Sequence, residues 1–142
     1  MIEAPQSRRI IRAILSAQGA ALAAAAMLFT MPAFAGSELS GAWSGGGSVV
    51  YSTGSKEKAR CRAQFKSTGG SSYAMNATCA TASGKVAQSA TLRKTGANSY
   101  SGSFRNPDYN VTGSIRVTVS GNSQSVSMSS DAGTASFSMS RL

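Results

Sequence analysis

The two cysteines of the chain, Cys61 and Cys79, lie nine residues before and nine residues after Gly70. On both sides of this glycine, small or apolar residues alternate with polar ones, as they do in half-buried strands. Pairing the two cysteines in an antiparallel hairpin also matches apolar residues on the same face, namely Ala63 with Ala77 and Phe65 with Met75. Because the disulfide and the alternation select the same register, the sequence predicts a disulfide-linked hairpin with one inward face.

The first 35 residues are typical of an export signal. They carry three early arginines, an apolar stretch over about residues 13–31 and small residues at positions 33 and 35. We therefore expect a signal peptide over residues 1–35, cleavage before Gly36, and a single mature domain over residues 36–142 that is periplasmic or secreted. The general secretory and twin-arginine routes stay open, since Ser7-Arg8-Arg9-Ile10-Ile11 resembles a twin-arginine motif.

The mature part is small and basic. It keeps 107 of the 142 residues, with 11 Lys and Arg against four Asp and Glu, so its net charge is about +7. Two cysteines separated by 17 residues in an exported chain favour a structural disulfide over a metal pair, and we expect no metal or other cofactor. A disulfide closing a loop of this size contributes roughly 3 kcal/mol to stability.

Alternation continues through the rest of the chain and divides it into eight predicted strands joined by short turns rich in Gly, Ser and Asn. Eight successive strands with one apolar face each predict an all-β fold, a small eight-stranded antiparallel up-and-down barrel. An outer-membrane barrel is disfavoured, because the apolar face is rich in Gly and Ala and lacks aromatic girdles. A turn around Ser52–Ser55 would place Trp43 opposite Phe65. Four glycines fall at inward positions, where we expect them to let strands bend: 45, 47, 102 and 113.

Catalytic residues are scarce in this sequence. The chain has no histidine, which excludes a histidine-based triad and histidine-ligated zinc. The strand assignment places the four mature acidic residues in a tail or in turns: Glu38, Glu57, Asp108 and Asp131. We therefore predict a non-enzymatic binding protein, acting as a monomer without a membrane span in its mature form.

A row of cations is the sharpest surface feature. Four of them project at alternate positions from the polar face of one predicted strand: Lys58, Arg60, Arg62 and Lys66. This basic stripe predicts an anionic partner such as lipopolysaccharide, phospholipid headgroups or an acidic protein surface. The alternative is a solvated strand face that keeps the protein soluble. Nucleic acid is excluded as a partner, since the chain is exported and no exposed aromatic residues interleave the stripe.

Aromatic residues at inward positions suggest a second kind of site. An eight-stranded barrel is wide enough either to be filled by side chains or to hold one small molecule. Five rings could line such a cup or pack as core: Trp43, Tyr51, Tyr73, Tyr100 and Phe104. The many other apolar inward residues favour packing. A small-molecule carrier with an aromatic cup is therefore an alternative function.

Several short motifs resemble known families. Ser40-Gly41-Ala42-Trp43, with its Gly-x-Trp on a first strand, resembles the calycin superfamily of lipocalins and avidins. A longer pattern resembles small exported bacterial β-barrel proteins of uncharacterised function: Gly41-Ala42-Trp43-Ser44-Gly45, Arg60-Cys61-Arg62, Cys79-Ala80 and Ser101-Gly102. These resemblances imply a calycin-like barrel, and the second brings no activity with it.

The N-terminal stretch from Ser37 to Trp43 resembles the start of exported inhibitors of serralysin-type metalloproteases. That resemblance implies a periplasmic protease inhibitor whose N-terminal tail enters the protease cleft while the barrel docks outside it. The tail would consist of Gly36, Ser37, Glu38, Leu39 and Ser40. The first cysteine departs from the inhibitor pattern, because it follows Trp43 by 18 positions.

Overall fold

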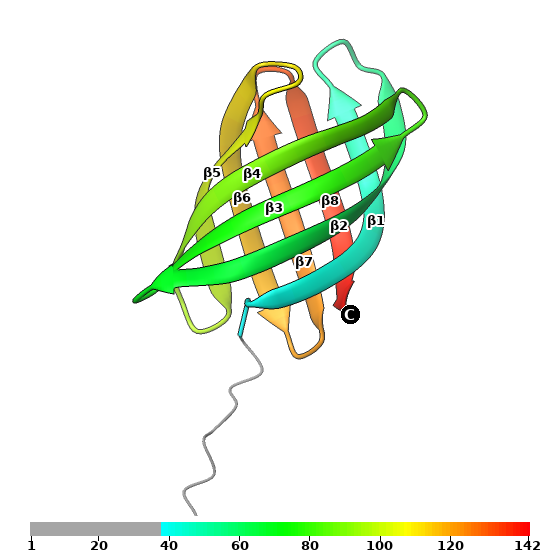
Figure 1. Ribbon diagram of the computed structural model, residues 1–142. Helices are drawn as coiled ribbons and strands as arrows, with labels where there is room; N and C mark the ends of the chain where they lie inside the picture. The colour runs from blue at the N-terminus through cyan, green and yellow to red at the C-terminus, as the bar shows by residue number, and fades with distance from the viewer. Residues whose placement is uncertain (1–37) are drawn as a thin grey trace, which may run out of the picture. The chain divides into compact units, whose positions relative to one another are not determined.

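The structure, a computed structural model, describes residues 38–142, so the predicted signal peptide and residues 36 and 37 lie outside the described part. Eight strands follow one another: β1 (Gly41–Tyr51), β2 (Lys56–Gly69), β3 (Ser72–Thr81), β4 (Gly84–Lys94), β5 (Ser99–Asn106), β6 (Val111–Ser120), β7 (Ser123–Ser130) and β8 (Gly133–Arg141). Each strand pairs antiparallel with the next, and β8 pairs with β1 to close the barrel (Figure 1). The predicted all-β, eight-stranded barrel is confirmed. Over the described residues, no helix has the length and apolarity to cross a membrane.

The register predicted for the disulfide hairpin is confirmed. In the β2–β3 ladder Cys61 lies opposite Cys79, and the two cysteines form a disulfide with their Cα atoms 4.1 Å apart. The flanking inward pairs are Ala63 with Ala77 and Phe65 with Met75. At the turn, Gly69 and Gly70 adopt positive φ angles of 119° and 57°, a conformation that glycine tolerates without steric cost.

The register predicted for β1 and β2 is wrong by two residues. Trp43 lies opposite Ala63, and Phe65 lies opposite Gly41. The ladder ends at the pair Val50 and Lys56, and the Tyr51 amide donates to the Ser55 carbonyl, 2.8 Å, which closes the turn in the same register. The turn is therefore centred on Thr53, one residue earlier than a pairing of Trp43 with Phe65 requires, and the two rings become diagonal neighbours rather than a direct pair.

Inward glycines allow neighbouring strands to approach closely. A Cβ atom on Gly47 would lie 1.8 Å from the Ser136 carbonyl oxygen of β8, and one on Gly102 would lie 1.8 Å from the Thr91 carbonyl oxygen of β4. Both distances are shorter than any real contact of a Cβ atom. The strands at these two positions can bend tightly only because no side chain intervenes.

The two ends of the barrel differ in their turns. We call the end with the β2–β3, β4–β5 and β6–β7 turns the base; the opposite end, with the four remaining turns, is the mouth. The large side chains buried most completely belong to the base half and the middle of the barrel: Leu39, Trp43, Phe65, Leu92, Tyr100, Ile115, Val117 and Val119. The core is therefore concentrated away from the mouth.

Candidate functional site in the open half of the barrel

The base is sealed by the residues that precede β1. Leu39 and Trp43 are both 0% exposed, and the Trp43 indole N–H donates to the Leu39 carbonyl, 3.0 Å. The Arg141 guanidinium lies 4.2 Å from the centre of the Trp43 ring and donates to the Ser40 and Glu38 carbonyls. These contacts, from both ends of the described chain, hold residues 38–40 across the base, and the base is thereby closed.

Two tyrosines pack beside this seal. The rings of Tyr73 and Tyr100 meet edge to face, with centroids 5.2 Å apart. The Tyr73 hydroxyl donates to Glu38 Oε1, 3.4 Å, and the Lys94 ammonium lies 5.9 Å from the centre of the Tyr100 ring. Burial raises the pKa of Tyr100 to about 12. Three of the five rings considered for a cup, Trp43 and these two tyrosines, therefore belong to the packed base.

A cavity of about 440 Å³ occupies the other half of the barrel, toward the mouth. Tyr51 and Phe104, the other two rings considered for a cup, line it. Most of the remaining wall is apolar and includes Val49, Val86, Val111, Met128, Ala135 and Phe137. The interior is thus filled at the base and open at the mouth.

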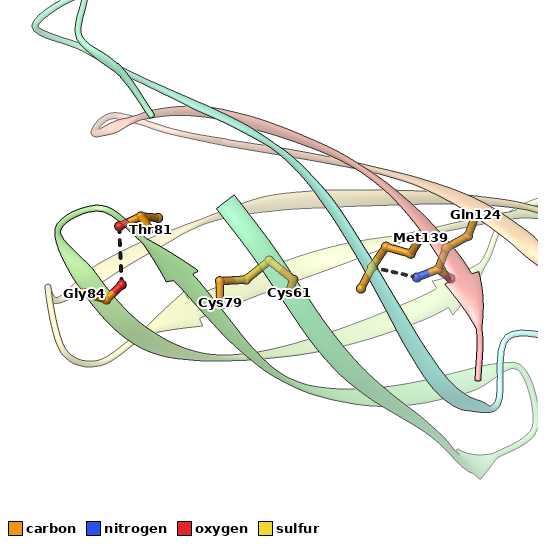
Figure 2. Close-up of a disulfide and its surroundings, with 6 residues drawn as sticks. All are labelled: Cys61, Cys79, Thr81, Gly84, Gln124 and Met139. Atoms are coloured by element: carbon orange, nitrogen blue, oxygen red, sulfur yellow. Dashed lines mark hydrogen bonds between the residues drawn. A yellow bond between two sulfur atoms is a disulfide. The ribbon is translucent and has the colours of Figure 1, made fainter. Parts of the chain in front are cut away.

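The disulfide lies between these two halves. Cys79 contributes to the cavity wall. From the disulfide toward the base, the inward pairs are first Ala63 with Ala77 and then Phe65 with Met75. Figure 2 shows the disulfide between Thr81, near the β3–β4 turn at the mouth, and Gln124, whose side-chain amide donates to the Met139 sulfur, 3.4 Å, at the base. The covalent link therefore fastens β2 to β3 where the packed core gives way to the cavity.

A carboxylate at the mouth is hydrogen-bonded to two residues of the cavity wall. The Tyr51 hydroxyl donates to Glu57 Oε2, 2.8 Å, and the Ser83 hydroxyl donates to Glu57 Oε1. The hydrogen bond from Ser83, followed by that from Tyr51, lowers the pKa of Glu57 and keeps it ionised. The sequence reasoning assigned Glu57 to a turn and missed this group, but Glu57 occupies an inward position of β2, opposite Val49.

Other polar groups of the cavity wall hydrogen-bond mainly to nearby backbone. The Thr81 hydroxyl donates to the Gly84 carbonyl, 3.3 Å, and the Ser130 hydroxyl donates to the Gly133 carbonyl, 3.5 Å. Asn106 Oδ1 accepts two backbone N–H groups from the β5–β6 turn. By contrast, Gln88 Oε1 is buried and has no hydrogen-bond partner among the described residues. Nowhere in residues 38–142 do three His, Cys, Asp or Glu side chains gather as a metal site would require.

The basic stripe lies on the outer surface of β2, away from the cavity. All four of its cations are exposed: Lys58, Arg60, Arg62 and Lys66. Their cross-strand neighbours on β1 and β3 are small or neutral, as shown by Gly46 and Ala80 beside Arg60, and Ser44 and Thr78 beside Arg62. The structure therefore brings the predicted stripe together without an acidic residue paired across either neighbouring strand.

The predicted inhibitory tail is described only from Glu38 onward, since Gly36 and Ser37 lie outside the described residues. Leu39 is buried in the base, and the Arg141 side chain binds the carbonyls of Glu38 and Ser40. Insertion of this segment into a protease cleft would require these contacts to break. The geometry therefore gives these three residues a structural role in closing the barrel.

No protein-family model and no curated protein matches the chain. Among solved structures, the redesigned barrel mFAP1 bound to DFHBI is 13% identical, with a TM-score of 0.64, covering 75% of this chain and 98% of that one. The redesigned barrel mFAP0 bound to DFHBI is 12% identical, with a TM-score of 0.61 and coverages of 72% and 98%. Rv2717c from M. tuberculosis is 14% identical, with a TM-score of 0.55 and coverages of 73% and 92%. The protein is thus a small eight-stranded barrel similar in fold to barrels that bind ligands.

Proposed function

We propose that the protein is a non-enzymatic binding protein that holds one small, mainly apolar molecule in the open half of its barrel. The observation that carries this proposal is the cavity of about 440 Å³ behind the mouth, with its apolar wall. Ligand pockets typically measure about 300 to 1,000 Å³ and combine apolar walls with a few polar groups. The redesigned barrels similar in fold were solved with a small molecule bound.

The distribution of side-chain size supports a binding cavity rather than loose packing. Protein interiors are close-packed, and voids larger than a water molecule are few. The base buries large rings such as Trp43 and Phe65 almost completely, whereas the mouth half has Ala59 and Ala135 at inward positions of β2 and β8. The open space therefore follows from small residues on the same strands that pack tightly at the other end.

A fluorescent apolar probe tests this proposal. We expect N-phenyl-1-naphthylamine to bind saturably, with one site per protein and a large increase in emission. Ala135→Trp should abolish this binding, since the new indole would occupy the cavity. Ser136→Trp is the matched control, because Ser136 is exposed on the outer face of the same strand. The proposal fails if the folded wild-type protein gives no saturable signal, or if the two variants bind the probe equally.

We propose the basic stripe as a second binding surface, for an anionic component of the cell envelope. The outer face of β7 carries no charge, because its outward residues are all serines: Ser123, Ser125, Ser127 and Ser129. Four cations on one strand, without acidic cross-strand neighbours, create instead a local positive potential. This role presupposes the predicted export to the periplasm or beyond.

Vesicle sedimentation tests the stripe. Arg60→Ser with Arg62→Ser should weaken binding to phosphatidylglycerol vesicles at low salt by about thirty-fold, since each cation near an anionic surface contributes about 1 kcal/mol. Arg105→Ser with Arg116→Ser makes the same change in net charge on β5 and β6 and serves as the control. Equal loss in the two double variants would attribute binding to net charge alone and refute a specific stripe.

A further inference from the structure

Four hydroxyl groups around the mouth are oriented by the protein itself. The hydrogens of Tyr51 and Ser83 point to the Glu57 carboxylate, and those of Thr81 and Ser130 point to backbone carbonyls. A hydroxyl has one hydrogen to donate and two lone pairs that accept. Since the hydrogens are already engaged, these four groups can offer a ligand only acceptor oxygens. The oxygens of Thr81 and Ser130 already accept from the backbone N–H groups of Ser83 and Ala132, so those of Tyr51 and Ser83 are the more open acceptors.

The charge at the mouth strengthens this preference. Among residues 38–142, no charged side chain lines the cavity, and Glu57 is hydrogen-bonded to both Tyr51 and Ser83. A hydroxyl that donates to a carboxylate becomes a better acceptor, because hydrogen bonds in a chain polarise one another. The neighbouring cations Lys56 and Lys58 are exposed at outward positions of β2. The negative charge of Glu57 is therefore transmitted inward through the two hydroxyl oxygens.

Deeper in the barrel a further acceptor has no partner. Gln88 is at an inward position of β4, opposite Ala77, and its Oε1 atom is buried without a partner among the described residues. Leaving a buried acceptor unsatisfied is costly. The Gln88 side chain would have to turn before this oxygen could accept from a ligand, so the rim hydroxyls are the acceptors that face a ligand directly.

We propose that the ligand class is an apolar amine, whose hydrocarbon part fills the cavity while its protonated amino group donates to Tyr51 and Ser83 in front of Glu57. This inference rests on the proposed binding function and specifies the ligand. An alkylammonium group has donors and no acceptor, which complements these oxygens, and its charge strengthens each hydrogen bond. A carboxylate of the same length would place acceptors against acceptors and a negative charge near Glu57.

Calorimetry with three ligands of equal chain length tests the inference: octylamine, octanol and octanoate, at about pH 7 and about 150 mM salt to screen the outer charges. We expect octylamine to bind about ten-fold more tightly than octanoate, with octanol between them. Glu57→Gln should remove most of the difference in affinity between the amine and the carboxylate. Asp131→Asn is the control, because Asp131 is exposed in the β7–β8 turn, and it should leave the order of affinities unchanged. The heat measured with Ala135→Trp, whose cavity is filled, reports binding outside the cavity and is subtracted from that of each other protein.

The outcomes separate the two proposals. If octanol binds but octanoate binds as tightly as octylamine, the cavity is a binding site and the amine inference is overturned. The same conclusion follows if Glu57→Gln leaves the preference intact. If none of the three ligands binds the folded wild-type protein above the Ala135→Trp background, the amine inference and the cavity proposal are both overturned.

Discussion

The base and the mouth of this barrel are built by the same strands with the same alternation, yet one end is packed and the other is open. Along β2 the inward position near the base is Phe65, and the corresponding position near the mouth is Ala59. Along β1 the contrast is between Trp43 and Val49. The difference teaches that alternation decides which side chains face inward, whereas their volumes decide whether the interior is core or cavity.

The two ends also differ in what holds them in place. At the base, Arg141 and Leu39 bring the last strand and the segment before β1 into one set of contacts. At the mouth, the polar contacts join neighbouring turns and strand ends, as in the link from Ser83 to Glu57. We infer that stability is concentrated at the base, which leaves the mouth free to present a binding surface.

The largest expected effect is that of truncating the base. Trp43→Ala should lower the free energy of unfolding by about 3 to 5 kcal/mol, the usual cost of deleting a fully buried large ring. Val86→Ala, in the half-buried cavity wall, should cost only about 1 kcal/mol. Guanidinium unfolding followed by circular dichroism measures both, since Trp43 is the only tryptophan. Similar losses in the two variants would contradict the division into a stabilising base and a binding mouth.

Removing the disulfide should have the next largest effect. Cys61→Ala with Cys79→Ala should lower the free energy of unfolding by roughly 3 kcal/mol, because the unfolded chain regains the freedom of the closed loop. Probe binding to the fraction that remains folded should change little, since only Cys79 contributes to the cavity wall. If stability is unchanged but probe binding is lost, the disulfide serves to shape the cavity rather than to stabilise the barrel.

High pH should lower the stability of the packed end of the barrel, because Tyr100 is buried there and ionises. Burial raises the pKa of this phenol from an ordinary value of 10.0 to about 12 in the folded protein. Between these two pH values the folded state keeps a proton that the unfolded state loses, so the free energy of unfolding falls as the pH rises, by roughly 2 to 3 kcal/mol in total.

Urea unfolding at several pH values from about 9 to about 12 measures this loss. Tyr100→Phe provides the comparison, because it keeps the ring and removes the ionising group. Its stability should depend less steeply on pH than that of the wild-type protein over this range. If the free energy of unfolding falls equally with pH in the two proteins, the ionisation of Tyr100 is not the cause of the loss of stability at high pH.

The fold was largely readable from the sequence because two independent signals agreed. The alternation defined the faces, and the spacing of Cys61 and Cys79 selected the register of β2 and β3. For β1 and β2 no such second signal exists, and a shift of two residues leaves every side chain on the same face. The alternation therefore could not predict the displacement of Trp43 relative to Phe65.

The division of the rings between core and cavity could have been read from strand order. In an up-and-down barrel the odd-numbered strands all begin at the same end. Trp43, Tyr73 and Tyr100 lie near the starts of β1, β3 and β5, whereas Tyr51 and Phe104 lie near the ends of β1 and β5. The roles of Leu39 and Glu57 could not be predicted in this way, since one precedes the first strand and the other depends on where a turn ends.

The smallest expected effect concerns the seal itself. Arg141→Lys keeps the charge but loses the planar group that lies over Trp43 and binds two carbonyls, so it should cost about 1 kcal/mol. Hydrogen exchange should show faster exchange of the Trp43 indole N–H, which donates to Leu39, while probe binding at the mouth stays unchanged. Arg116→Lys, on the outer face of β6, is the matched control and should alter neither. If Arg141→Lys weakens probe binding without speeding this exchange, the base and mouth are coupled, and the packed end is part of the site.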